Sequence, residues 1–179
     1  MKKYHHHAKK TALAAMVALA LSSTGVFAAA LPVDGEVVAG QVTVGDMTYV
    51  PVGANQQKVY INPATGQTFT VVGNSVIDWS TFDIGSEKAL TFEGQGSNYI
   101  LNQVPWNNEA SKIYGILNTR NIHFILANPN GITVGNGAQL NVTDGGSILL
   151  AAMGAGFNNA NNSITLQNYS YGNKSAINI

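Results

Sequence analysis

Short apolar runs alternate with breaks rich in glycine and asparagine along the whole chain after residue 30. This alternation is typical of many short β-strands separated by turns. Only residues 108–116 show a helical pattern, and their β-branched and aromatic side chains argue against a helix. The strands predicted from the pattern are residues 37–38, 41–44, 48–52, 59–61, 68–72, 76–79, 89–92, 99–101, 113–117, 122–126, 132–134, 139–142, 148–152, 163–167 and 176–179.

Three all-β architectures fit many short strands: a sandwich, a closed barrel and a β-solenoid. Sandwiches and barrels favour tight hairpins that join strands of five or more residues. The strands predicted in the second half of this chain are often shorter, and asparagine is concentrated between them. Short sides with asparagine or glycine corners favour a β-helix, in which stacked corners can align into side-chain ladders. No fixed repeat is visible, since Ile148 and Ile164 are sixteen residues apart and Ile177 follows thirteen later.

The segment Asn128-Pro129-Asn130-Gly131-Ile132 has the composition of a tight turn between two apolar runs. Asparagine suits the first position of a type I turn, proline sets φ at the second, asparagine tolerates the third and glycine suits the fourth. The sequence therefore predicts a turn here that passes the chain from one strand to the next.

The first thirty residues have the pattern of an export signal. An uncharged apolar stretch covers residues 11–27, and small residues follow it up to Ala30. We expect residues 1–30 to be a signal peptide that is cleaved after Ala28 or Ala30. An uncleaved N-terminal anchor is the alternative. The basic residues that precede the apolar stretch are Lys2, Lys3, Lys9 and Lys10.

Charge and cysteine content limit the function of the remaining residues, 31–179. All nine acidic residues but only five of the nine basic ones lie there, which gives a net charge of 5 − 9 = −4. A nucleic-acid-binding protein needs a basic face, so no nucleic-acid partner is predicted. The chain has no cysteine, so burial and backbone pairing must stabilise the fold without disulfides. The length after residue 30 fits a single domain.

Candidates for catalytic or metal-binding residues are few. His123 is the single histidine after residue 30, so a Ser-His-Asp arrangement would have to use it. Its place in an apolar run predicts a strand residue that faces outward or is hydrogen-bonded. We predict no catalytic residues, no cofactor and no metal site, although carboxylates can bind calcium. The acidic residues that lie densest are expected to solvate an outer face, and they are Asp78, Asp83, Glu87 and Glu93.

The two tryptophans have different settings. Trp79 lies in the alternating segment 76–85, which predicts a core position. Trp106 follows Pro105 and precedes two asparagines, which predicts a loop. We expect it to pack within the loop, and a contact with a partner is the alternative.

The C-terminal residues 175–179 alternate like a strand, and no polar cap follows them. Because an open solenoid end exposes core and unpaired backbone, we expect either a fragment of a longer protein, which we favour, or a partner that covers the end. Four triplets match the N-glycosylation pattern, and in a chain so rich in Asn, Ser and Thr they carry little weight. They begin at Asn141, Asn161, Asn168 and Asn173.

Four segments in order resemble the N-terminal secretion domain of filamentous haemagglutinin-type exoproteins, the large partners of two-partner secretion systems. The first follows the signal peptide, the second contains Trp79 and ends in Phe-Asp-Ile-Gly, the third spans two strands, and the fourth has Asn-Pro-Asn-Gly-Ile at its centre. They are residues 31–40, 76–85, 98–104 with 111–115, and 124–137.

The resemblance implies a right-handed parallel β-helix with N-terminal capping strands over residues 31–179, as the N-terminal part of a longer exoprotein. It also implies export to the periplasm and binding to the periplasmic part of a dedicated outer-membrane β-barrel transporter. The rest of the exoprotein, an adhesin of the haemagglutinin type, would then be secreted or displayed at the cell surface, where downstream regions could bind host or surface ligands. The residues that match the family's secretion motif are Asn128, Pro129, Asn130, Gly131 and Ile132.

Two features depart from the family pattern. Many members have a second motif, Asn-Pro-Asn-Leu, whereas the other Asn-Pro here is Asn62-Pro63, within an expected insertion at residues 46–69. The signal peptide also lacks the extended basic region of some relatives. Two other functions stay open from the residues: the leading domain of a contact-dependent toxin exoprotein, and a β-helix enzyme that acts on polysaccharide. The single arginine, Arg120, counts against the enzyme.

Overall fold

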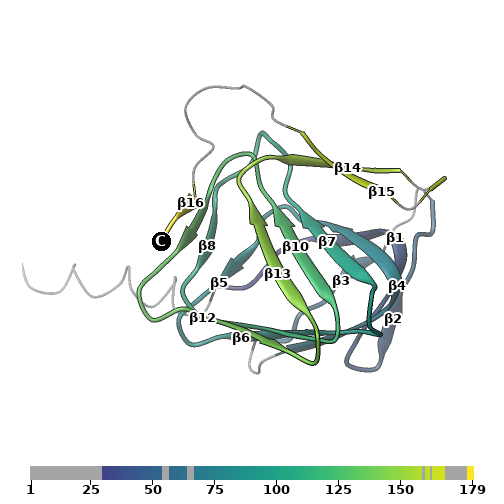
Figure 1. The fold of residues 1–179 in the computed structure, drawn as a ribbon, viewed down its shortest axis with the longest axis horizontal. Coiled ribbons are helices and arrows are strands. Elements are labelled where there is room, and N and C mark those ends of the chain that lie inside the picture. The colour runs from purple at the N-terminus through teal and green to yellow at the C-terminus, as the bar shows by residue number, and fades with distance from the viewer. Residues whose placement is uncertain (1–29, 54–56, 64–66, 159, 162, 168–176) are drawn as a thin grey trace, which may run out of the picture.

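Parallel stacking of short strands builds the molecule, which we describe from a computed structural model. The structure describes residues 30–53, 57–63, 67–158, 160–161, 163–167 and 177–179. Within them the chain forms a parallel β-solenoid of about four turns with extra strands at its N-terminal end (Figure 1). The prediction of a parallel β-helix is therefore confirmed, and the sandwich and barrel alternatives are excluded.

Each turn of the solenoid presents three sides, and strands on the same side pair in parallel with the turn before and after. The first side stacks the C-terminal half of β4 (Gln67–Asp78), then β7 (Tyr99–Gln103), β10 (His123–Ala127) and β13 (Ser147–Ala151). The second stacks β5 (Asp83–Ile84), β8 (Ser111–Ile113), β11 (Ile132–Val134) and β16 (Ile177–Asn178). The third stacks the N-terminal half of β4 with β6 (Ala89–Glu93), β9 (Ile116–Arg120) and β12 (Gln139–Thr143).

Apolar side chains that alternate along each strand point into the solenoid and form one core. Aromatic rings occupy its N-terminal half: Phe69 stacks on Phe92 with ring centroids 4.4 Å apart, and Phe124 lies 4.9 Å from Phe92. Phe82 and Trp79 continue this cluster toward the N-terminal end, and Trp79 is 1% exposed. The predicted core position of Trp79 is confirmed.

The N-terminal strands close one end of the core. β1 (Gly35–Val44) runs antiparallel to β4 along nearly its whole length, and it also pairs with β2 (Met47–Tyr49) and β3 (Lys58–Val59). Both short strands lie within the segment that the sequence marked as an insertion, 46–69. The expected capping strands are thus confirmed, and part of the insertion belongs to the cap.

A hairpin outside the solenoid covers part of its first side. β14 (Gly154–Asn158) and β15 (Ser163–Gln167) pair antiparallel and lie across the outer face in Figure 1. Their apolar side chains pack against outward-facing residues of β1, β4, β7 and β10, and the contacting hairpin residues are Ala155, Phe157 and Ile164.

The structure settles three points about the elements, of which one predicted strand was wrong. No helix forms at 108–116, as the β-branched and aromatic side chains there indicated, and β8 lies in this segment. The strand predicted at 113–117 is two strands, because the chain turns at Gly115, where a Cβ atom would lie 2.2 Å from the Gly85 carbonyl oxygen. A repeat that the sequence did not reveal is present on the first side. His123 pairs there with Tyr99 on the preceding turn and with Ser147 on the following turn, and His123 and Ser147 are 24 residues apart.

Candidate functional site

The Asn-Pro-Asn-Gly-Ile turn forms the corner between β10 and β11. The Gly131 amide donates to the Asn128 carbonyl oxygen at 3.1 Å, which is the closing hydrogen bond expected of a β-turn. Gly131 has φ of 108°, a value that a residue with a side chain rarely adopts, whereas Asn130 is not among the described residues with positive φ. Both features agree with the predicted type I turn.

Asn128 is the buried centre of this corner, with no exposed surface. Its side-chain amide donates to the Glu109 carbonyl oxygen at 2.9 Å and to the Ser111 hydroxyl at 3.0 Å. Its side-chain oxygen accepts from the Asn130 backbone amide at 2.9 Å and from the Asn130 side chain at 2.8 Å. An aspartate here would lose both donated bonds and bury a charge, so the geometry specifies asparagine.

The turn is also bonded to the turns of the solenoid on either side of it. The Asn128 amide donates to the Ala151 carbonyl oxygen of β13, and the Ser111 amide of β8 donates to the Gly131 carbonyl oxygen, both at 3.0 Å. The Asn130 side chain donates to the Pro105 carbonyl oxygen at 2.8 Å. The corner is therefore held by hydrogen bonds from both sides, which keeps the neighbouring corners in register.

The five motif residues therefore divide by position. Ile132 is fully buried in the core, and Asn128 lies buried above it. Pro129 instead lines a surface pocket of ≈ 230 Å³. The same pocket is lined by Pro105 and Trp106 on the loop that Asn130 contacts. Trp106 is 59% exposed, which confirms its predicted loop position.

The sequence suggested that the four densest acidic residues solvate an outer face, but two of them are largely buried. Burial raises the pKa of Asp78, and its carboxylate accepts a hydrogen bond from the Gln103 side-chain amide. Burial likewise raises the pKa of Asp83, whose carboxylate accepts from the Lys112 backbone amide at 2.7 Å. Glu87 is exposed, as expected. Sequence periodicity could not reveal this, because loops and the β14–β15 hairpin cover outward positions.

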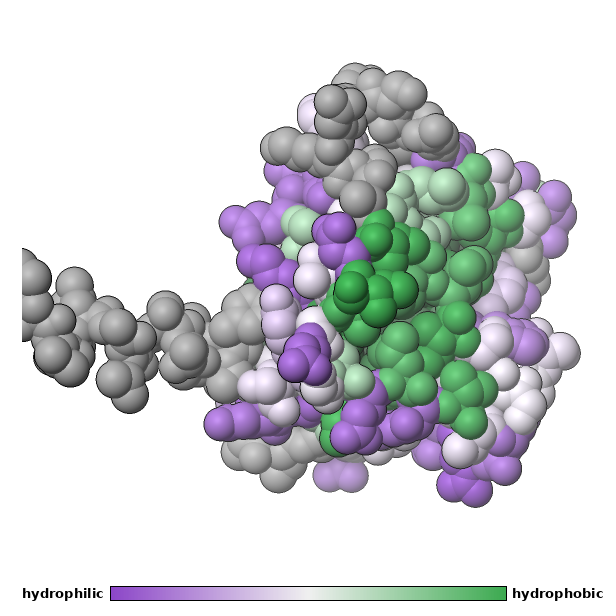
Figure 2. Space-filling view, turned by 60° about the vertical axis from the view of Figure 1, so that its left-hand side comes forward, coloured by the Kyte–Doolittle hydropathy of each residue, from purple (hydrophilic) through white to green (hydrophobic). Residues whose placement is uncertain are grey.

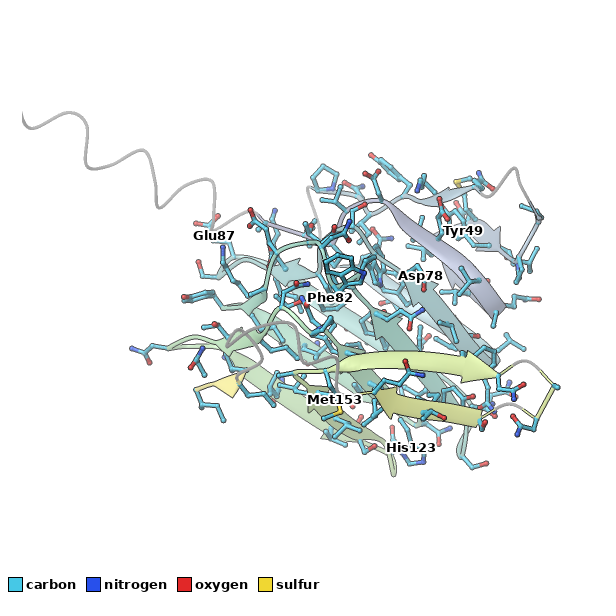
Figure 3. All side chains as sticks on the ribbon, turned by 90° about the horizontal axis from the view of Figure 1, so that it is seen from above. Tyr49, Asp78, Phe82, Glu87, His123 and Met153 are labelled. Atoms are coloured by element: carbon cyan, nitrogen blue, oxygen red, sulfur yellow. The ribbon has the colours of Figure 1, made fainter. Side chains whose placement is uncertain are left out.

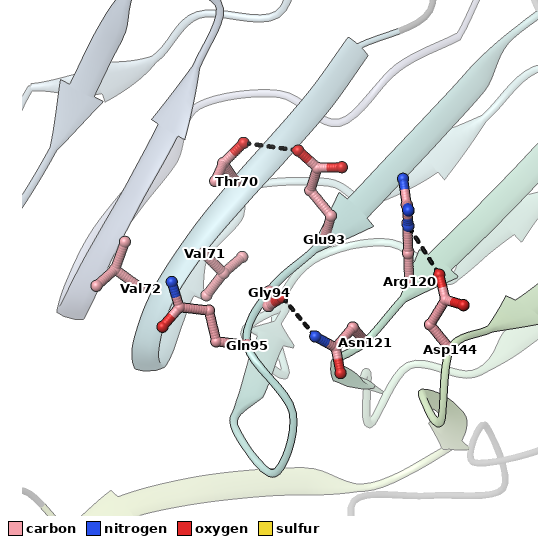
Figure 4. A pocket seen from close by; sticks show the side chains of 9 residues that line it. All are labelled: Thr70, Val71, Val72, Glu93, Gly94, Gln95, Arg120, Asn121 and Asp144. Carbon is pink, nitrogen blue, oxygen red and sulfur yellow. Dashed lines mark hydrogen bonds and ion pairs between the residues drawn. The ribbon is translucent and has the colours of Figure 1, made fainter.

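A second groove, of ≈ 420 Å³, follows the corners between the third and first sides (Figure 4). Within it Arg120 pairs with Asp144 at 2.8 Å and Glu93 accepts from Thr70 at 3.1 Å. Asn121 donates to the Gly94 carbonyl oxygen at 3.2 Å. The charged side chains that line this groove therefore all have partners within it.

His123 has the strand position predicted for it, and it lies at the lower edge of the molecule in Figure 3. Its Nδ1 lies 2.9 Å from the Ser147 hydroxyl on the next turn. In the described part of the chain, no three His, Asp or Glu side chains are arranged to hold a metal ion. None of the described residues forms a helix of the length and apolarity needed to cross a membrane.

The glycosylation triplets gain no support from the geometry of the described ones. The Asn141 side chain donates to Asn118 at 2.9 Å, as part of the side-chain ladder expected from stacked asparagines. The Asn161 side-chain oxygen accepts from the backbone and hydroxyl of Ser163. Asn168 and Asn173 lie outside the described residues.

The fold and the corner define the class of this protein, which is a capped parallel β-solenoid. The chain matches the family model described as "TPS secretion domain" over residues 37–174. Since this match covers most of the chain, the chain belongs to the TPS secretion domain family, and the family predicted from the four segments is confirmed. Exoproteins with this domain are secreted by two-partner systems of Gram-negative bacteria.

Individual relatives agree with the family. Two heme/hemopexin-binding proteins of Haemophilus influenzae, one of them from strain ATCC 51907 / DSM 11121 / KW20 / Rd, are 37% identical over 87 residues and 41% identical over 66 residues. These matches cover 47% and 37% of this chain but only 9% and 7% of the relatives. The crystal structure of the HMW1 secretion domain from Haemophilus influenzae is similar in fold, with a TM-score of 0.52 and 23% identity over 73% of this chain and 29% of that one.

Proposed function

We propose that this chain is a non-enzymatic targeting domain that directs a larger exoprotein through an outer-membrane β-barrel transporter by binding the transporter's periplasmic part. The observation that carries the proposal is the family match over residues 37–174 on a capped solenoid. The domain works as a folded recognition surface, so it needs neither a cofactor nor a catalytic group.

Passage across the inner membrane belongs to the same proposal. Residues 1–30 act as the signal peptide, and they lie outside the described residues apart from Ala30. Residues 31–179 then form the secretion domain at the start of the exoprotein. The matched parts of the chain cover less than a tenth of the length of the curated relatives, which supports a longer protein.

The exoprotein that follows is proposed to be a surface or secreted adhesin. The relatives are named for binding heme and hemopexin, and a toxin exoprotein is the second candidate. A site for heme in this domain finds little support, because His123 is its single histidine and it has no cysteine. We therefore propose that the activity of the exoprotein lies outside this domain.

A reporter fusion tests the targeting function directly. Residues 1–179 are joined to a passenger that does not cross the outer membrane alone, and the fusion is expressed with and without the transporter of the same system. We expect passenger in the medium only when both are present. Passenger that stays in the periplasm with a functional transporter would contradict the proposal.

The turn is tested by Gly131→Val in the same fusion. Valine at φ of 108° is strained, which costs about 1–3 kcal/mol. We expect a clear fall in secreted passenger, measured together with the amount retained in the periplasm. Gly137→Val is the matched control, since Gly137 also has positive φ, at 87°, and a Cβ atom there would meet nothing within 4 Å. Equal secretion by Gly131→Val and the wild type would contradict a role for the turn.

A further inference from the structure

The pocket beside the Asn-Pro-Asn-Gly-Ile turn has apolar walls that come from separate parts of the chain. Pro105 and Trp106 follow β7, Pro129 belongs to the turn, and Ala155 belongs to the β14–β15 hairpin. The Trp106 side chain is 59% exposed although it stands at a pocket of ≈ 230 Å³. Exposed tryptophan beside proline rings is the kind of surface that anchors a partner's side chain.

The polar side of the pocket is acidic. Asp78, at the end of β4, and Gln103, at the end of β7, lie side by side in register. The Gln103 amide nitrogen donates to the Asp78 carboxylate, and this bond turns the Gln103 side-chain oxygen away, where it is buried without a partner among the described residues. The polar end of the pocket is therefore the Asp78 carboxylate, which accepts a hydrogen bond from the neutral Gln103 side chain.

No cation of the described residues contributes to the pKa shift of the Asp78 carboxylate, so an opposite charge does not offset its desolvation. Burial raises the pKa of this carboxylate, and the negative charge of Glu36, its register partner on the adjacent strand β1, raises it further. Lys58 pairs with Glu36, and Arg120 pairs with Asp144 in the other groove. A partner that brought a positive charge to Asp78 would gain a charge-assisted hydrogen bond and offset the desolvation of the carboxylate.

We propose that this pocket binds a basic side chain, with arginine preferred over lysine, from an extended segment in the periplasmic part of the transporter. The guanidinium group reaches Asp78, its plane stacks on the Trp106 indole, and its methylene stem packs on the Pro105 and Pro129 rings. Arginine fits better because its planar group both stacks and forks toward a carboxylate. This inference rests on the proposed function and names the chemistry of the contact.

The net charge of the domain supports a basic partner. Residues 31–179 carry nine acidic and five basic side chains, which makes the domain negative overall. Complementary charge speeds the encounter of two proteins and sets their orientation.

The pocket also gives the turn a second role. Pro129 forms one wall, and the Asn130 side chain holds the Pro105 carbonyl oxygen at 2.8 Å, which positions the loop that carries Trp106. The turn thus builds the docking pocket, while Asn128 and Ile132 stay buried beneath it. The motif acts on the transporter mainly through the shape of this pocket.

Binding measurements with the exported chain test the proposal. The probe is the soluble periplasmic part of the transporter from the same system, titrated in a calorimeter. Asp78→Asn keeps an oxygen that accepts from Gln103, and Trp106→Ala removes an exposed ring. We expect each to weaken binding about tenfold or more, as anchor residues do. The loss from Asp78→Asn should shrink as salt is raised.

Matched controls separate the pocket from general effects. Tyr60→Ala removes an aromatic ring that is 64% exposed on the cap, and Glu93→Gln removes an acid from the other groove. Both should keep the wild-type dissociation constant within about twofold. The melting temperature of every variant is measured to show that it is folded.

A double-mutant cycle identifies the partner side chain. Each arginine and lysine of the periplasmic part is changed to glutamine and combined with Asp78→Asn. One arginine should show a coupling of about fivefold or more with Asp78, while the others are additive. If the wild type binds and the pocket variants bind equally well, or if no basic residue couples, the pocket proposal is wrong and the targeting function stands. If the wild type neither binds the transporter nor exports the fusion, both are wrong.

Discussion

The two ends of the solenoid differ although their inward-facing pattern is the same. At the N-terminal end β1 lies across β4, and the core positions beneath it are fully buried. At the other end β12 pairs only with β9 among the described strands. Leu140 and Val142 align with the buried Leu117 and Thr119, yet they are 38% and 46% exposed. Figure 2 shows an apolar area on the side where β12, β13 and β16 lie.

This difference shows that a neighbouring turn, more than the residue type, decides whether an inward position is buried. The cap blocks one end, so further turns can stack only on the other. We propose that downstream turns of the exoprotein use this open end as a template, and that each added turn buries apolar area and biases movement outward. Secretion rates of exoproteins with destabilised downstream turns test this bias, and unchanged rates would contradict it.

The largest effect is expected from a change that prevents the cap from closing. A Cβ atom on Gly35 would lie 2.4 Å from the indole ring of Trp79, which is held by a 2.9 Å bond from its Nε1 to Asn102. Gly35→Val should therefore destabilise the domain by about 3 kcal/mol or more, measured by urea unfolding.

Gly145→Ala is its counterpart near the open end. Gly145 has φ of 78° with nothing within 4 Å of a Cβ position, so alanine adds only backbone strain, about 1 kcal/mol. Equal losses for Gly35→Val and Gly145→Ala would show that the cap is not what stabilises the core.

The next effect compares one column of leucines on successive turns. Leu117 is fully buried and Leu140, its partner on the following turn, is partly exposed. Leu117→Ala should cost about 2–5 kcal/mol of unfolding free energy, whereas Leu140→Ala should cost about 1 kcal/mol. In a longer exoprotein chain the cost of Leu140→Ala should rise toward that of Leu117→Ala. A cost that stays the same would mean that no turn stacks there.

Local chemistry made some of these features predictable from the sequence. The turn at 128–132 and the buried Trp79 follow from residues close in the chain, and the capping strands followed from the family resemblance. The repeat did not, because the spacing of stacked residues changes from side to side and from turn to turn. Partners are 24 residues apart for His123 and Ser147, 29 for Asp83 and Lys112, and 23 for Asn118 and Asn141.

The first strand of the hairpin, β14, and the pocket could not be predicted from the sequence for another reason. β14 reads Gly-Ala-Gly-Phe-Asn, a composition with weak strand propensity, and its pairing with β15 compensates for that. The pocket joins residues from β4, β7, the turn and β14, which no local pattern connects. Long-range packing decided both.

The smallest predicted change in stability compares a largely buried carboxylate near the capped end with an exposed carboxylate near the other end. Asp83 lies in the first full turn, and burial raises its pKa above the ordinary value. Because the folded-state pKa is raised, the protonated Asp83 carboxyl contributes fully to the stability of the folded domain below about pH 4. This contribution is lost as the pH rises through the folded-state pKa. Asp83→Asn should therefore stabilise the domain slightly at neutral pH, by about 0.5 kcal/mol, since asparagine still accepts from the Lys112 amide.

The difference between Asp83→Asn and the wild type should vanish as the pH falls toward about 4, followed by urea unfolding across that range. Asp144→Asn is the control from the last described turn, where the carboxylate pairs with Arg120 and both side chains are more than half exposed. Breaking this exposed pair should change stability by less than about 1 kcal/mol, and raised salt should reduce the change. If Asp83→Asn instead destabilises the domain at neutral pH, the hydrogen bond from Lys112 stabilises the Asp83 carboxylate by more than its burial costs.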